Sequence, residues 1–388
     1  MKKIIIVNNN MRVGGVQKSL YNLLWSLEGQ YEITLCLFRS VGAYVDQLPP
    51  WVKIVETDGL FRFLGVSQSE CQGFDKIKRG ILAAVCRGFG RPTVMRWILR
   101  SQKALDEQYD CAIAFLHNGN EKNFYGGVQE FVLHKVKANQ KVAFLHCDFR
   151  NCGADMPANR QLLKQFDRIA ACSDGCREAF CAAMPELADR CVTVRNFHRY
   201  EEIRQLSQEN TVEYEENRVH ILMVSRLAHE KGIDRAIEAV VNGAQKGHCV
   251  QLHIVGGGPW EEMLRRKVQE LDAEDWVQFC GEQKNPYRYM VNADLFLMAS
   301  YHEAAPMVIE EAECLGIPVL TTRTTSSRDM VEEADIGWVC DNDQQALNET
   351  LERILADQDL LREKKKMLQS RCVDNMAAEE QFVRLIEA

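Results

Sequence analysis

The sequence has no apolar run long enough to cross a bilayer, no fixed-period repeat and no low-complexity tract. It also lacks a basic excess, because 55 acidic residues outnumber 47 lysines and arginines and leave a formal net charge of −8. That balance argues against broad binding to nucleic acids. The composition, 46% hydrophobic and 26% charged, is that of a globular protein. At 388 residues the chain exceeds what one hydrophobic core usually supports, so we expect two domains.

The fifteen cysteines include no C-x2-C pair. Cys172, Cys176 and Cys181 are separated by three and four residues, which is only a weak metal signal, and we predict no metal site. Cys36 and Cys111 fall in strand-like runs, where a reduced cysteine behaves as a small buried hydrophobe. The first three residues lead into only four apolar ones, too few for a signal peptide. Together these observations favour a reducing cytoplasm.

The chain alternates strand-like and helix-like segments in two consecutive runs, which predicts an α/β protein with parallel sheets covered on both faces. The strands expected in the first half are Ile4 to Val7, Ile33 to Phe38, Cys111 to Phe115, Val142 to Leu145, Ile169 to Ala171 and Val192 to Val194. Those expected in the second half are His220 to Val224, Val250 to Val255, Val277 to Cys280, Leu295 to Met298 and Val319 to Thr322. A polar, acidic stretch lies between the halves, so we place the domain boundary near residues 196–198.

Two carboxylates frame one strand-loop-helix turn in the second half. Glu303 follows the apolar run Leu295 to Met298, and Pro306 suits the first turn of the next helix. Glu311 lies eight residues after Glu303 within that helix, which we expect to stop at Gly316. In an open α/β sheet ligands bind at the mouth of such turns, and a helix N-terminus favours phosphate. Two carboxylates beside a phosphate site suit a nucleotide-sugar, which has many hydroxyls and a diphosphate.

One series of residues resembles the E-x7-E signature of retaining glycosyltransferases similar to glycosyltransferase family 4. In chain order these residues are Glu303, Glu311, Ala312, Gly316 and Pro318-Val319. That resemblance implies the GT-B architecture, in which two Rossmann-like domains have parallel sheets facing a central cleft. Within that family, the sequence is similar to bacterial enzymes that build capsule, teichoic acid or lipopolysaccharide. The resemblance therefore implies a hexosyltransferase of cell-surface polysaccharide synthesis that moves a sugar to a saccharide or polyprenyl-linked acceptor.

The resemblance also divides the chain. Residues 1–197 correspond to the acceptor-side domain and residues 198–370 to the nucleotide-sugar-binding domain. Residues 371–388 include a last helix that we expect to cross back to the first domain.

Residue roles follow from the same resemblance. Glu303 contacts the transferred sugar, and Glu311 holds the ribose hydroxyls. Ala305 and Pro306 are expected to bind the donor. Many relatives have Gly or Ser and then Phe or Leu after the first glutamate, whereas this chain has Ala304-Ala305. That departure leaves the identity of the donor sugar open, and UDP is expected only because it is the commonest nucleotide among relatives.

Two cations, Arg226 and Lys231, lie five residues apart in the loop after the strand His220 to Val224. Family members carry an arginine and a lysine at these places, where they neutralise charge that grows on the departing diphosphate. We therefore expect both residues to act in catalysis. The resemblance implies transfer without a bound metal or cofactor, with a phosphate oxygen accepting the acceptor's proton. Two exposed basic residues beside a turn are the alternative interpretation.

Glycines mark two further loops. Gly14-Gly15 follows the first strand and its polar loop, where paired glycines let backbone amides approach a ligand. Gly256 and Gly258, in the Gly-Gly-Gly-Pro turn, match a turn that shapes the nucleotide pocket in the family. That turn lacks the G-x-G-x-x-G spacing of a dinucleotide fingerprint, so a plain tight turn is an equally good interpretation.

Three polar residues follow first-domain strands. His146 stands at the end of Val142 to Leu145 and matches a histidine that reaches the donor sugar in many relatives, so we include it among the catalytic residues. Asp148 and His117 are weaker candidates for contacts with the acceptor.

The segment Lys76 to Lys103 contains eight lysines or arginines, no acid and many apolar residues, Trp97 among them. Such a sequence suits the surface of an anionic bilayer, which would place the protein peripherally on the inner face of the plasma membrane. Ordinary helices that pack their apolar sides inward remain the alternative.

Two other functions share this architecture. One is a catalytically silent subunit that supports a partner transferase, and the other is a nucleotide-sugar epimerase. Intact Glu303, Glu311, Arg226 and Lys231 argue against a silent subunit, and the scarcity of acid-base candidates argues against an epimerase.

Overall fold

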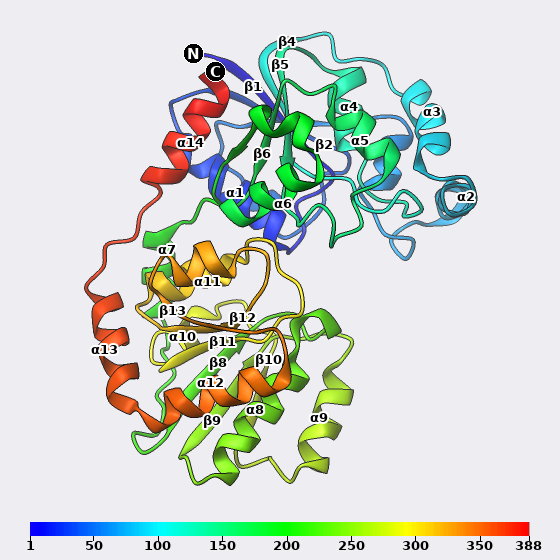
Figure 1. The fold of residues 1–388 in the computed structure, drawn as a ribbon. Helices are drawn as coiled ribbons and strands as arrows, with labels where there is room; N and C mark the ends of the chain where they lie inside the picture. Colours follow the sequence, from blue (N-terminus) through cyan, green and yellow to red (C-terminus); the bar gives the residue numbers. More distant parts are fainter. Residues whose placement is uncertain (388) are drawn as a thin grey trace. The chain divides into compact units, whose positions relative to one another are not determined.

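Two parallel β-sheets organise the computed structural model, which describes residues 1–387 (Figure 1). The chain forms two units. The first contains Met1–Phe197 together with the chain from Asn375 onward, and the second contains His198–Asp374. Each unit is an α/β layer structure built around one of the sheets. No helix of the described chain is long and apolar enough to span a membrane.

The first unit holds a seven-stranded sheet in the order β3-β2-β1-β4-β5-β6-β7. Its strands are β1 (Lys3–Asn8), β2 (Glu32–Leu37), β3 (Lys53–Glu56), β4 (Gln108–Ala114), β5 (Lys137–Leu145), β6 (Arg168–Ala171) and β7 (Cys191–Thr193). All neighbouring pairs run parallel. The central strand β1 reads KIIIVN and is buried along most of its length, as expected for a strand with helices on both sides.

The second unit holds a six-stranded sheet in the order β10-β9-β8-β11-β12-β13, again parallel throughout. Its strands are β8 (Val219–Val224), β9 (Val250–Val255), β10 (Val277–Gly281), β11 (Leu295–Met298), β12 (Val319–Thr322) and β13 (Gly337–Cys340). Ile221 of β8 packs in one apolar cluster with α8 and α12 residues, while its neighbour Leu222 packs in a second cluster with α7 and α11 residues. Both faces of this sheet are therefore covered.

Most helices lie between successive strands of one sheet, whereas α7 precedes the first strand of the second unit and α12, α13 and α14 follow the last strand. Those of the first unit are α1 (Gly15–Ser26), α2 (Gly73–Phe89), α3 (Arg91–Ser101), α4 (Val128–Lys135), α5 (Pro157–Leu163), α6 (Asp174–Ala183) and α14 (Met376–Glu387). Those of the second are α7 (Tyr200–Ser207), α8 (Ile233–Gln245), α9 (Glu261–Glu270), α10 (Tyr287–Met290), α11 (Met307–Cys314), α12 (Gln344–Ala356) and α13 (Gln358–Gln369).

The last helix, α14, packs within the first unit. Phe382 is fully buried, and its ring lies 6.1 Å from that of Phe197. Gln381 accepts a hydrogen bond from the backbone amide of Arg195 at 3.0 Å. The chain thus leaves the second unit at Asp374 and adds a helix to the first.

Three elements differ from the sequence-based expectation. The edge strands β3 and β13 were not predicted: β3 has only two adjacent apolar residues between a lysine and a glutamate, and β13 begins with a glycine. The stretch after the domain boundary was expected to lack an apolar stripe, but it begins with α7, which buries Tyr200 and Ile203. Two well-spaced apolar residues suffice for a helix of two turns that packs on α10 and α11.

Candidate active site

The order of strands reverses at one point in the second sheet. The chain builds β8, β9 and β10 outward in one direction, and then returns to add β11, β12 and β13 on the other side of β8. Strands β8 and β11 are parallel neighbours, so the loops at their carboxyl ends open side by side. Ligands of open α/β sheets bind at such a switch point. Lys231 follows β8 and Glu303 follows β11, which places both predicted residues there.

An ion pair joins these two residues. Lys231 Nζ donates to Glu303 Oε1 at 2.5 Å, and Ser300 Oγ donates to the same oxygen at 3.0 Å. The two charged side chains are 25% and 13% exposed. Both hydrogen bonds use Oε1, and no donor among residues 1–387 engages Oε2, which is available to a ligand. A cation and a carboxylate that are largely shielded from water act more strongly on a ligand than exposed ones do.

Tyr301, in the loop after β11, contacts the turn η4 (His229–Lys231) and holds the two segments together. Its amide donates to the carbonyl of Glu230 at 2.9 Å, and its ring stacks on His229 with centroids 5.0 Å apart. The guanidinium carbon of the buried Arg235 lies 3.8 Å from the centre of the same ring. These contacts fix the position of Lys231 relative to Glu303. Sequence reasoning did not find them, because the aromatic and basic residues carry no motif of their own.

Arg226 lies apart from the ion pair. Its side chain is 66% exposed and pairs with Glu230, four residues along the chain. The structure therefore brings Lys231 and Glu303 together but does not place Arg226 in contact with either. An exposed guanidinium on a short loop retains the reach and the donors needed to grip a phosphate.

The second predicted carboxylate is buried. Glu311 lies in α11 and is 2% exposed. Pro306 was predicted in the first turn of that helix, but it lies at the N-cap in an extended conformation, and the helix begins one residue later, at Met307. Ala305 is half-buried beside it. Gly316, with φ +72°, follows the last turn, as the sequence indicated. A short helix thus begins at Met307, four residues after Glu303.

The glycine turn after β9 has a packing role of its own. A Cβ atom on Gly258 would lie 2.4 Å from the carbonyl oxygen of Leu227, and one on Gly256 would lie 1.9 Å from that of Ser225. Gly256 also adopts φ +145°. The turn needs glycine in order to pack against the loop after β8, and a ligand is not required to explain either residue.

The first sheet has its own switch point between β1 and β4, and the predicted Gly14-Gly15 pair lies there. A Cβ on Gly15 would meet nothing within 4 Å, and one on Gly14 would approach only the flexible side chain of Gln17. Packing within the protein therefore does not require glycine at Gly15. A bare backbone that faces open space suits the close approach of a ligand.

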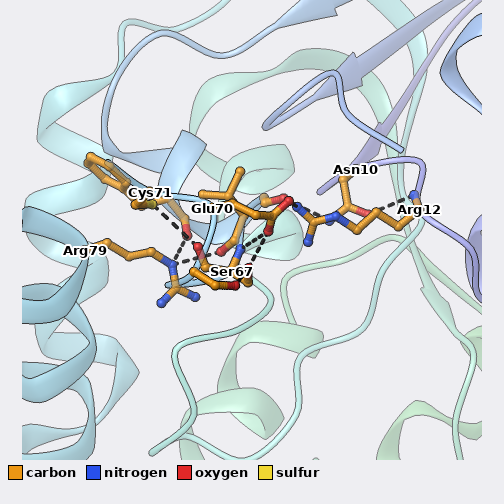
Figure 2. Close-up of polar contacts among 10 residues, drawn as sticks. Asn10, Arg12, Ser67, Glu70, Cys71 and Arg79 are labelled. Carbon is orange, nitrogen blue, oxygen red and sulfur yellow. Dashed lines mark hydrogen bonds and ion pairs between the residues drawn. The ribbon is translucent and has the colours of Figure 1, made fainter. Parts of the chain in front are cut away.

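The loop that leads to these glycines is anchored from the segment before α2, as Figure 2 shows. Asn10 Nδ2 donates to the carbonyl of Gly65 at 3.0 Å, and Arg12 forms an ion pair with Glu70. Glu70 also accepts from the amide and the hydroxyl of Ser67, and these hydrogen bonds hold the pKa of its carboxyl below the usual range. The anchoring holds the loop before Gly14 in a defined conformation.

His146 follows β5 and stacks on Phe144, with ring centroids 4.5 Å apart and planes at 6°. Phe115 lies at the same centroid distance on another side. Burial lowers the pKa of His146 to about 3, so its imidazole is neutral at physiological pH. Its Nε2 atom is buried and has no hydrogen-bond partner among residues 1–387. The ring can exchange hydrogen bonds with a ligand but cannot supply a positive charge.

The two weaker candidates of the first unit differ. Asp148 accepts from the backbone amides of Arg150 and Asn151 at 3.1 and 3.0 Å, so it shapes its own turn. The Nδ1 atom of His117 is buried and unpaired in the described structure, and burial lowers the pKa of this histidine to about 4.

Two parallel sheets, each with ligand-suited loops at its switch point, define an α/β fold of the GT-B type. The whole chain superposes on the crystal structure of Anabaena HepE in complex with UDP with a TM-score of 0.67 and 17% identity, covering 100% of both chains. Residues 205–371 match the family model described as Glycosyl transferases group 1. The matched segment coincides with most of the second unit.

Curated relatives match over part of the chain. The amylovoran biosynthesis glycosyltransferase AmsK of Erwinia amylovora is 33% identical over 145 residues, which is 35% of this chain and 36% of the relative. The putative colanic acid biosynthesis glycosyltransferase WcaL of Escherichia coli K12 is 34% identical over 142 residues, 34% of this chain and 35% of the relative. The matched residues thus span about a third of the length of these relatives.

Proposed function

We propose that this protein is a retaining glycosyltransferase that moves a hexose from a UDP-sugar to a saccharide or lipid-linked acceptor in bacterial surface-polysaccharide synthesis. The observation that carries the proposal is the ion pair between Lys231 and Glu303, 2.5 Å long, at the switch point of a group 1 glycosyl transferase domain. UDP is favoured because the Anabaena HepE structure contains it. The acceptor class is favoured by the names of AmsK and WcaL, two glycosyltransferases of polysaccharide biosynthesis.

Each group has a role that its chemistry supports. Lys231 and Arg226 bind the diphosphate. The lysine acts as a point charge held by its ion pair, and the exposed arginine donates bidentate hydrogen bonds. Glu311 accepts hydrogen bonds from the ribose hydroxyls, and Glu303 accepts from a hydroxyl of the transferred sugar through Oε2. When the diphosphate leaves, Lys231 stabilises the negative charge that develops on it.

The transfer step needs no protein base. The acceptor oxygen forms a bond to the anomeric carbon on the face from which the diphosphate departs, while the bond between that carbon and the phosphate oxygen breaks. The acceptor's proton passes to a phosphate oxygen of the leaving UDP. Lys231 and Arg226 provide the positive charge that a divalent cation supplies in other nucleotide-sugar enzymes, and we expect this step to proceed without one.

The proposal is tested by the release of UDP from a panel of UDP-, GDP- and ADP-sugars, with Glu303→Gln and Lys231→Ala alongside. We expect one UDP-sugar to be consumed by the wild type and spared by both variants. Consumption of a GDP- or ADP-sugar in the same pattern would keep the transferase and change the nucleotide. Conversion of the sugar without nucleotide release would indicate an epimerase, and no turnover with intact nucleotide binding would indicate a silent subunit.

An acceptor on a lipid is favoured by helices α2 and α3. Helix α2 packs on α3 rather than on the sheet, and Figure 1 shows the two helices at one side of the first unit. Phe74, Ile77 and Ile81 are 81%, 60% and 55% exposed, and their spacing places them on one side of α2. Large apolar side chains exposed in a row mark an interaction surface.

The charge of this region is smaller than the sequence indicated. Arg91 is buried, where it pairs with Glu130, and Arg79 is half-buried and donates to the carbonyls of Phe63 and Val66. The sequence alone predicts both as surface cations. The six basic residues that remain exposed are Lys76, Lys78, Arg87, Arg96, Arg100 and Lys103. Each contributes at most about 1 kcal/mol near an anionic surface, so the apolar row is needed as well.

We propose that this face rests on an anionic bilayer, on the side of the plasma membrane that faces the cytoplasm. Co-sedimentation with phosphatidylglycerol vesicles tests it, using Phe74→Ser combined with Ile77→Ser against Met263→Ser, an exposed apolar residue of the second unit. We expect the double variant to remain in solution and the control to sediment like the wild type. Equal sedimentation of all three, or none by the wild type at low salt, contradicts the proposal.

A further inference from the structure

Three residues of the first unit present ligand atoms that converge at one place. These are an imidazole nitrogen of His117 and the sulfur atoms of Cys147 and Cys152, and all three atoms lie within 4.8 Å of one another. The sequence did not reveal the group, because its members are thirty and five residues apart and form no C-x2-C motif. Sequence reasoning weighed His117 only as a contact for the acceptor.

The fold explains the convergence. Strands β4 and β5 are parallel neighbours, so the residues after them meet at one edge of the sheet. Cys147 comes two residues after β5 ends, and His117 comes three residues after the last residue of β4. A turn then returns the chain, because the amide of Cys152 donates to the carbonyl of Asp148 at 2.9 Å. Cys152 is thereby brought back over Cys147.

The chemistry of the group favours a soft cation. The Nδ1 atom of His117 is buried and has no hydrogen-bond partner in the described chain, so it is available to bind a metal ion. The two sulfur atoms and this nitrogen lie close enough for one ion to reach all three. Thiols bind a metal as thiolates, so a bound cation favours loss of both thiol protons.

We propose that His117, Cys147 and Cys152 form a zinc-binding site at the carboxyl edge of the first sheet. Two thiolates and one imidazole are a ligand set that Zn²⁺ uses, and three protein ligands leave a fourth position for water or another ligand. Bonds of about 2.0–2.3 Å place the ligand atoms of a tetrahedral zinc roughly 3.5–3.8 Å apart. The three atoms, now within 4.8 Å of one another, need to approach by about 1.3 Å at most. The two thiol protons are released to solvent as the ion binds.

Access to the site comes from the side of Cys152. This residue is exposed, whereas Cys147 is buried. A second pair of thiols, Cys172 and Cys176, lies near Cys147 with sulfur atoms 3.9 Å apart, but both are buried. We therefore assign the site to the three residues that include the accessible thiol. This assignment is independent of the proposed donor chemistry, which rests on residues of the second unit.

Cobalt titration tests the site on the full-length protein, reduced and kept free of oxygen. Co²⁺ bound by thiolates gives a charge-transfer absorption in the near ultraviolet, and Zn²⁺ added afterwards should abolish it. We expect the absorption to reach its maximum at one equivalent of Co²⁺ in the wild type. Cys152→Ser should lose most of it and should weaken Zn²⁺ binding by more than the roughly 10–100-fold that loss of an outer-shell partner costs.

Matched variants keep the test decisive. Cys249→Ser removes another exposed thiol, in the second unit, and should keep the full absorption. Cys172→Ser should keep it as well. Because Cys152 is exposed, its serine variant should fold, and an unchanged melting temperature without metal checks this. No absorption in the wild type at one equivalent overturns the proposal. An undiminished absorption in Cys152→Ser, or its loss in Cys172→Ser, also overturns it.

Discussion

Replacing Lys231 by alanine tests the role of its ammonium group directly. The variant removes the donor that lies 2.5 Å from Glu303 and leaves Ser300 as the remaining hydrogen-bond donor to that carboxylate. The chain offers a matched control in Lys246→Ala. Lys246 pairs with Glu352 at the same 2.5 Å distance in the same unit, but these two side chains are 49% and 38% exposed.

The two ion pairs should differ modestly in their effect on stability. Exposed pairs contribute about 0.2–1 kcal/mol, so Lys246→Ala should change the free energy of unfolding by no more than that. The Lys231 pair is better shielded, and its loss leaves Glu303 poorly compensated, so we expect a cost of about 1–2 kcal/mol. In a domain of this size, 1 kcal/mol shifts the melting temperature by about 2–4 °C.

Lys231→Ala and Lys246→Ala should differ more in nucleotide binding than in their free energy of unfolding. A nucleotide at about 100 times its dissociation constant stabilises the folded state by about 2.7 kcal/mol, which corresponds to an upward shift of about 5–10 °C. Thermal denaturation with and without UDP measures this shift. We expect the wild type and Lys246→Ala to show it in full and Lys231→Ala to lose most of it.

One result would refute the reasoning. If Lys231→Ala retained the full UDP-dependent shift, the ammonium would not contact the diphosphate, and the ion pair with Glu303 would be only a structural contact. Lys231→Arg provides the conservative variant, which keeps a positive charge and should recover part of the shift.

Three further outcomes follow from the structure. Glu311→Gln should lose the preference for UDP over 2′-deoxy-UDP, a difference of about 1.5–3 kcal/mol measured by calorimetry, and an unchanged preference would remove the ribose role. Gly258→Ala should lower stability by at least about 2 kcal/mol because its Cβ would meet a carbonyl oxygen at 2.4 Å, whereas Gly15→Ala should melt like the wild type and lose turnover. Burial lowers the pKa of His253 to about 4, and its Nε2 atom lies 2.9 Å from Nδ1 of His220. Between pH 4 and about 6.5 the folded state therefore binds fewer protons than the unfolded state. The free energy of unfolding should fall by up to about 3 kcal/mol as the pH drops from 6.5 to 4, and it should be constant above pH 6.5. Urea titrations at several pH values measure it, and His253→Gln should remove most of this pH dependence.

The central strands could be predicted from the sequence because burial on both faces leaves continuous apolar runs. The edge strands β3 and β13 were missed, although the other edge strands, β7 and β10, were predicted. KIVE has only two adjacent apolar residues, and GWVC begins with a glycine, which weakens a strand signal. Arg91 shows a second limit. Its charge suggested a surface residue, yet Glu130 and Asn159 on other segments provide partners that allow its burial. Such partners are set by tertiary packing, which a single sequence does not display.

The candidate donor site was predicted as separate residues rather than as an arrangement. The turn at Glu303 and the loop at Lys231 each carry a local signal, but their 2.5 Å contact depends on the pairing of β8 with β11. The supporting contacts of Tyr301 and Arg235 have no motif and required the structure. Gly256 and Gly258 illustrate the reverse case, because backbone packing explains residues for which the family resemblance indicated a ligand.

Proton NMR of the reaction tests most directly whether the protein transfers a sugar from UDP with retention at the anomeric carbon. The protein is incubated with the α-linked UDP-sugar that the nucleotide-release panel identifies, with water as the acceptor when no other acceptor is added, and the anomeric signal of the first product is followed. We expect UDP and the α-anomer to appear together, and neither to appear with Lys231→Ala. An initial β-anomer would contradict the retaining mechanism, and the absence of nucleotide release from every sugar in the panel would contradict the transferase itself.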